Sequence, residues 1–122
     1  MTNDLAAIPL FDPVAIEKLR AVAGDQGTTF VAEMAQLFLQ ESANALEDLK
    51  RSRDQGEWKQ VTRIAHSLKS SSATLGLMRL SAACRSLELD TKSGAASPET
   101  PRLVAALLDE FDRATPTLEG LS

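Results

Sequence analysis

The only histidine of the chain, His66, lies on a predicted helix face that points away from the core. At about 100° per residue, the apolar and small side chains around it share the opposite face. These inward residues are Val61, Ile64, Ala65, Leu68, Ser72 and Leu75. His66 falls roughly 140° from the middle of that face, so we expect its ring in solvent. The neutral ring offers a nitrogen lone pair near physiological pH and can therefore act as a nucleophile.

Basic and small side chains surround the predicted position of His66. Lys59 and Arg63 share its outer stripe, and Lys69 follows one helical turn later. The short side chains that neighbour the ring are those of Thr62, Ser70 and Ala73. A nucleophile with cations nearby and a low rim is suited to carrying an anionic group that another protein must reach. The charge of Lys69 would offset the near-dianion that a phosphoryl group adds.

The run from Ala65 to Gly76 resembles the signature of histidine-containing phosphotransfer (HPt) domains, His-x-Leu-Lys-Gly-x-x-x-x-Leu-Gly. The matching positions are His66, Leu68, Lys69, Leu75 and Gly76. Ser70 stands where the family usually has glycine, and serine is the next-smallest polar choice. The flanking helices also resemble the family, and the resemblance covers roughly Phe11 to Leu118.

The resemblance implies an intermediate in a multistep two-component phosphorelay, a carrier protein without catalytic turnover of its own. His66 would accept a phosphoryl group from receiver-domain aspartates and donate it to them. The partners would be the receiver domain of a response regulator, of a hybrid histidine kinase, or of both. The receiver supplies magnesium, so the chain is expected to need no metal or cofactor.

Helical spacing places the expected binding residues around the phosphoacceptor. Lys69 would stabilise the phosphoryl group, while Ser70, Arg63 and Ala73 would border the ring. HPt domains dock receivers through an apolar patch beside the histidine, formed partly by the start of the second helix. Either Phe30 or Met34 could contribute to that patch, although core packing is the simpler explanation for both.

Composition favours a single helical domain in the 122 residues. Aromatic residues make up only 4% and tyrosine is absent, which favours close-packed helices over a sheet. The net charge of −4 argues against nucleic acid and anionic membrane surfaces. One histidine and one cysteine, Cys84, provide no zinc site and no internal disulfide. Without a signal-peptide or transmembrane pattern, the expected location is the cytoplasm.

The hydrophobic periodicity predicts an all-α, up-down-up-down four-helix bundle with a short additional N-terminal helix. Residues 1–10 are expected to form a flexible arm, and residues 11–122 the HPt-like bundle domain, a monomer. The five helices are predicted at about 13–23, 28–53, 57–75, 78–92 and from 98 or 101 onwards. Val22 belongs to the apolar stripe predicted for the first helix, and Leu37 recurs at helical spacing among the apolar residues of the second. Pro116 is expected to end or kink the last helix.

Two other functions fit an exposed histidine on a helix. The dimerisation and phosphoacceptor module of a histidine kinase places an acidic residue directly after the histidine and a proline soon afterwards. Here Ser67 follows His66, the next proline after the histidine is Pro98, and the 122 residues contain no ATP-binding domain with glycine-rich boxes. An interaction bundle that binds a partner without accepting phosphate is the other alternative, and the presence of both His66 and Lys69 speaks against it.

Overall fold

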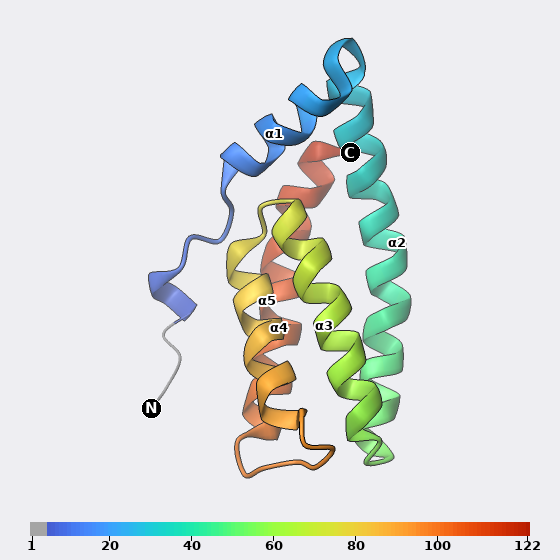
Figure 1. Ribbon diagram of the computed structural model, residues 1–122, viewed down its shortest axis with the longest axis vertical. Coiled ribbons are helices and arrows are strands. Elements are labelled where there is room, and N and C mark those ends of the chain that lie inside the picture. Colours follow the sequence, from blue (N-terminus) through green and yellow to red (C-terminus); the bar gives the residue numbers. More distant parts are fainter. Residues whose placement is uncertain (1–4) are drawn as a thin grey trace.

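The computed structural model describes residues 5–122 and consists of helices joined by short turns (Figure 1). The long helices are α2 (Gly27–Asp54), α3 (Trp58–Thr74), α4 (Met78–Thr91) and α5 (Thr100–Leu121). They run alternately down and up as a bundle, and the shorter α1 (Pro13–Ala23) lies across its upper end. Two short 3-10 turns, η1 (Leu5–Ala7) and η2 (Gly24–Gln26), flank α1. The predicted all-α four-helix bundle is confirmed.

Branched aliphatic side chains fill the interior of the bundle. The largest ones with almost no exposure are Leu49, Leu75, Leu77, Leu80, Leu87, Leu107 and Leu118. Phe38 of α2 and Phe111 of α5 add one tilted aromatic pair, with ring centroids 6.5 Å apart. Burial of these chains is the main force that holds the helices together. It also explains how so few aromatic residues suffice for the fold.

Most helix ends lie within one or two residues of their predicted positions. Asp12 caps α1, because its Oδ1 accepts a hydrogen bond from the Val14 amide at 3.0 Å. The start of α5 is Thr100 rather than Ser97. The helix does not end at Pro116 but continues to Leu121, since packing of the last turn outweighs the backbone hydrogen bond lost at proline.

Two residues of the predicted apolar stripes are exposed. Val22 near the end of α1 is 80% exposed, and Leu37 of α2 is 54% exposed. Helical periodicity finds the apolar stripe of a helix but not how much of that stripe the neighbouring helices cover. The apolar spacing therefore does not determine the burial of Val22 and Leu37, and the exposed position of Leu37 becomes relevant to the site below.

Gly76 lies in the turn between α3 and α4, where its backbone contacts the start of α1. Its φ of 76° is a conformation that side chains disfavour, and its carbonyl accepts a hydrogen bond from the Asp12 amide at 2.8 Å. A Cβ at this position would collide with the Asp12 carbonyl oxygen and approach Ala15 Cβ to 3.1 Å. Glycine is therefore required both to turn the chain and to let α1 approach the bundle.

Part of the predicted N-terminal arm contacts the bundle. Leu5 packs against the core, and Arg79 Nε of α4 donates a hydrogen bond to the Ile8 carbonyl at 2.9 Å. Residues 1–4 of the predicted arm lie outside the described residues. The division of the chain at residues 10 and 11 stays a prediction.

Candidate functional site

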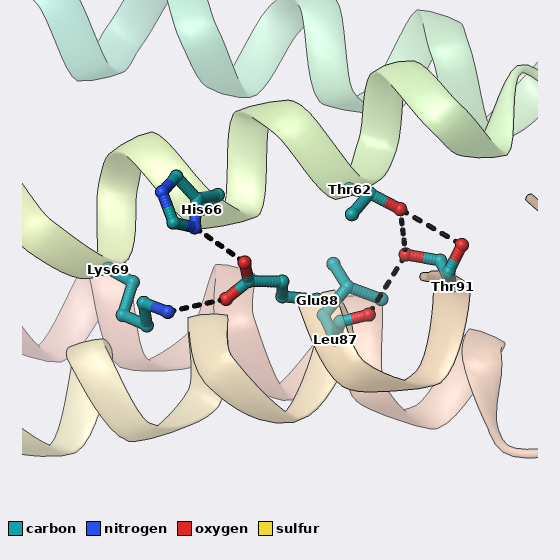
Figure 2. Close-up of polar contacts among 6 residues, drawn as sticks. All are labelled: Thr62, His66, Lys69, Leu87, Glu88 and Thr91. Carbon is teal, nitrogen blue, oxygen red and sulfur yellow. Dashed lines mark hydrogen bonds and ion pairs between the residues drawn. The ribbon is translucent and has the colours of Figure 1, made fainter. Parts of the chain in front are cut away.

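His66 lies near the middle of α3 and its side chain is 62% exposed. The core-facing residues of α3 are Val61, Ile64, Ala65, Leu68 and Ser72, as their spacing predicts. The ring leans toward α4, where it meets the carboxylate of Glu88 (Figure 2). The imidazole is thus accessible on one side and held by a neighbouring helix on the other.

Glu88 connects His66 and Lys69 through its two carboxylate oxygens. Oε2 lies 2.5 Å from His66 Nδ1, and Oε1 lies 2.6 Å from Lys69 Nζ (Figure 2). The side chain of Glu88 is only 16% exposed, and that of Lys69 is 30% exposed. The hydrogen bond from Lys69 lowers the pKa of the Glu88 carboxyl against the opposing effect of burial, and the bond to His66 lowers it further. Glu88 is therefore a carboxylate at neutral pH.

The contact with Glu88 distinguishes the two ring nitrogens of His66. A carboxylate only accepts hydrogen bonds, so a neutral ring bonded to it carries its proton on Nδ1. The other nitrogen, Nε2, then keeps its lone pair. Since Nδ1 faces α4, Nε2 is the nucleophilic atom available to a second molecule.

Hydrogen bonds at both ends of the α3–α4 pair set the position of Glu88. Thr62 Oγ1, one turn before His66, lies 2.7 Å from Thr91 Oγ1 and 3.0 Å from the Thr91 carbonyl oxygen (Figure 2). Toward the other end, Ser81 Oγ donates to the Lys69 carbonyl at 2.9 Å. These contacts fix the register of α4 along α3 and so bring Glu88 opposite His66.

Glu88 is a site residue that the sequence pattern did not predict. It lies 22 residues from His66 in the chain, and their meeting depends on the register of two helices. A signal was present, because Glu88 follows Cys84 by four residues and so continues the predicted inner face of the fourth helix. A carboxylate at the edge of that face needs a partner on the neighbouring helix.

The other predicted binding residues lie at different distances from the ring. Ser70 is exposed one turn after His66, and Ala73 is half-buried one further turn away. Arg63 is exposed and donates a hydrogen bond to Gln60 Oε1 at 3.1 Å, rather than binding the ring or Glu88. Lys69 is the predicted residue that the structure joins to His66, through Glu88.

A groove between α2 and α3 lies on the flank of His66 away from Glu88. Its upper part is lined by Met34, Leu37, Phe38, Glu41, Ser71, Thr74 and Leu75. Its lower part includes Arg63 and Ser67, the residue next to His66. Met34 is therefore part of a surface that reaches the histidine. Phe30 is half-buried and does not line this groove.

Three further observations concern metal ligands, the cysteine and membrane-spanning helices in the described part of the chain. No group of three or more histidine, cysteine or acidic side chains is placed to hold a metal ion within residues 5–122. The thiol of Cys84 is fully buried, and burial raises its pKa to about 12. Across the same residues, no helix has the length and apolarity needed to span a bilayer.

Comparison with known proteins gives one family and one related structure. The sequence matches the model of the Hpt domain over residues 33–115. The fold is similar to the crystal structure of histidine-containing phosphotransfer protein B (HptB) from Pseudomonas aeruginosa PAO1, with a TM-score of 0.80. The two chains are 22% identical, and the match covers 93% of this chain and 94% of the other. A search of curated proteins finds no match. The resemblance stated from the sequence motif is confirmed.

Proposed function

Because the chain belongs to the Hpt domain family, whose members are histidine phosphotransfer intermediates in phosphorelays, we propose that its phosphoacceptor is His66. One observation carries the proposal: the chain contains a single histidine, and that histidine is exposed. Hpt proteins are phosphoryl carriers rather than enzymes, so the chemistry needed here is limited to one nucleophilic atom and its surroundings. The contacts of His66 support this assignment.

We propose that the phosphoryl group is carried on Nε2. The hydrogen bond between Nδ1 and Glu88 leaves Nε2 as the free nucleophile on the solvent side. The Nε2 lone pair attacks the phosphorus of a phosphorylated aspartate, the N–P bond forms, and the O–P bond to the aspartate carboxylate breaks. No proton moves in this step, because the ring keeps its proton on Nδ1 and becomes a cation.

Glu88 and Lys69 stabilise the charges that this step creates. The carboxylate of Glu88 faces the nitrogen that shares the new positive charge of the ring, as the aspartate does for histidine in serine protease triads. Lys69 lies on the same side of α3 and supplies a cation near the phosphoryl oxygens. Transfer back to an aspartate reverses the step. The chain therefore supplies orientation and charge, which are the main requirements of phosphoryl transfer.

The proposed partners are receiver domains of a response regulator, a hybrid histidine kinase, or both. A receiver must reach Nε2, and Ser70 and Ala73 leave room beside the ring. The groove between α2 and α3, which includes Met34 and the exposed Leu37, is the proposed apolar docking patch. The protein is expected to act as a monomer in the cytoplasm.

Phosphorylation by a receiver domain tests the assignment of His66. Wild type and His66→Gln are incubated with a ³²P-labelled receiver domain, and acid-labile, base-stable label on the chain is measured. His66→Gln should take up no label, while its free energy of unfolding should change by no more than about 0.5 kcal/mol because the side chain is exposed. Uptake of label by His66→Gln would show that the phosphoacceptor is another residue.

Two further variants separate charge from shape at the site. Lys69→Ala removes the cation and should slow transfer in a way that high salt reproduces in the wild type. Ser70→Leu adds bulk beside the ring, and such a steric defect, roughly a hundredfold in rate, should persist at every salt concentration. Unimpaired transfer by Ser70→Leu would remove Ser70 from the docking surface.

A further inference from the structure

The charges of this acidic chain are unevenly distributed along its sequence. Residues 58–92, which form α3 and α4, contain six lysines and arginines but only two acidic residues. The rest of the chain contains seven basic and fifteen acidic residues. The segment that holds His66 therefore has a net charge of +4, against −8 for the remainder. Figure 1 shows α3 and α4 side by side, so this positive charge belongs to one pair of neighbouring helices.

Both acidic residues of this segment are engaged within the molecule. Glu88 binds His66 and Lys69, and Asp90 accepts hydrogen bonds from the hydroxyls of Ser97 and Thr100. By contrast, Arg85 and Lys92 are exposed and have no carboxylate within ion-pair distance in residues 5–122. Their charge is directed to solvent and is available to a second molecule.

Arg85 lies in a shallow trough on the outer face of α4. Two open hollows share the residues Ile8, Ala82, Arg85 and Leu89, and together they form this trough. One of the hollows extends to Lys69, Glu88 and Lys92, so the trough borders the phosphoacceptor site directly. Leu89 is 58% exposed and provides an apolar surface between the cations. The trough and the groove between α2 and α3 thus lie on opposite flanks of His66.

We propose that the α4 trough is a docking surface for an acidic face of the phosphorelay partner, recognised by Arg85 and Lys92 and packed on Leu89. This inference rests on the proposed function and adds a second contact to the one at the α2–α3 groove. The partner must bring an aspartate and a phosphoryl group, both anionic, up to His66. Unpaired cations beside the site accelerate and orient such an encounter. A partner that contacts both flanks also covers the ring and excludes water during transfer.

A charge reversal with a matched control tests the trough. Arg85→Glu reverses one charge in the trough, and Arg113→Glu makes the same net change on α5, which does not contact α3. Stopped-flow fluorescence measures association of each variant with a labelled receiver domain of net negative charge, activated with magnesium and beryllofluoride. Salt concentration is varied from about 20 mM to about 500 mM, which shortens the screening length severalfold.

Arg85→Glu should lower the association rate constant about tenfold at low salt and approach the wild-type value at high salt. Arg113→Glu should stay within about twofold of wild type at every salt concentration. Equal slowing in the two variants would mean that only the total charge matters, and unchanged association in Arg85→Glu would remove the trough from the interface. Either result overturns the inference. Thermal melts of both variants verify that the fold is retained.

The same measurements in a His66→Gln background separate this inference from the proposed function. Binding needs no phosphoryl transfer, so the difference between Arg85→Glu and Arg113→Glu should persist when His66 is absent. If the wild type binds the receiver with this charge dependence but accepts no phosphate, the proposed function fails and the docking surface stands. If transfer occurs with no charge dependence of binding, the docking surface fails alone.

Discussion

Replacement of Glu88 by alanine tests whether the ring of His66 must be held by its neighbour on α4. The change removes the carboxylate at 2.5 Å from Nδ1 and also releases Lys69 Nζ at 2.6 Å. Hydrogen bonds to charged groups contribute about 1.5–3 kcal/mol of stabilisation. Because His66 is exposed, its bond to Glu88 should lie at the lower end of that range. A loss of about 1.4 kcal/mol in the transition state corresponds to a tenfold lower rate.

Glu88→Ala is therefore expected to lower both the rate of phosphoryl transfer and the stability of the fold. Transfer should slow by roughly ten- to a hundredfold, because the ring cation loses its counter-charge and the proton is no longer confined to Nδ1. The folded state should lose no more than about 1 kcal/mol, since the ion pair is partly exposed. For a domain of this size that corresponds to a melting temperature lower by about 4 °C. Glu88→Gln keeps an acceptor for Nδ1 without the charge, and its rate should fall between those of Glu88→Ala and the wild type.

Single-turnover transfer from a phosphorylated receiver domain measures the rates of the three proteins. Nuclear magnetic resonance of the ¹⁵N-labelled ring identifies the phosphorylated nitrogen, which should be Nε2 in the wild type. If Glu88→Ala transfers at the wild-type rate, the carboxylate does not prepare the ring for reaction. Phosphorylation of the wild type on Nδ1 would refute the orientation argument directly.

Four other properties can be checked with simple measurements. Gly76→Ala should lower the free energy of unfolding in urea by more than about 2 kcal/mol, because the alanine would need a φ of 76° and its Cβ would collide with a carbonyl oxygen. Gly24 has a φ of 59° but open space around it, so Gly24→Ala should lower the free energy of unfolding by only about 1 kcal/mol. The lowered pKa of Glu88 contributes stability that is present above about pH 4.5 and is lost as the pH falls through the pKa of Glu88 in the folded protein. Glu88→Gln should abolish this part of the pH dependence of stability. Cys84, with its pKa raised to about 12, should react with a thiol reagent at pH 8 only at the rate of unfolding. Light scattering should give the mass of a monomer, and a dimer that buries α2 and α3 would instead resemble a kinase module.

The sequence alone was sufficient to predict the features that depend on neighbouring residues along one helix. Helical periodicity predicted the bundle class, the outward position of His66 and the place of Lys69 one turn later, because 3.6 residues per turn fix these relations locally. The cap of α1 is also a local feature, since Asp12 and the Val14 amide that it binds are two residues apart. The motif identified the family for the same reason: its positions lie within a single helix and the turn that follows.

Only the tertiary structure decided what depends on how helices pack against one another. Glu88 meets His66 because hydrogen bonds between α3 and α4, such as that joining Thr62 and Thr91, set their register, and no local pattern encodes that register. Packing likewise determined that Leu37 is exposed in an apolar stripe, and that Met34 rather than Phe30 lines the α2–α3 groove. A periodic pattern tells which face of a helix is apolar, but the area that a neighbouring helix covers depends on crossing angle and register.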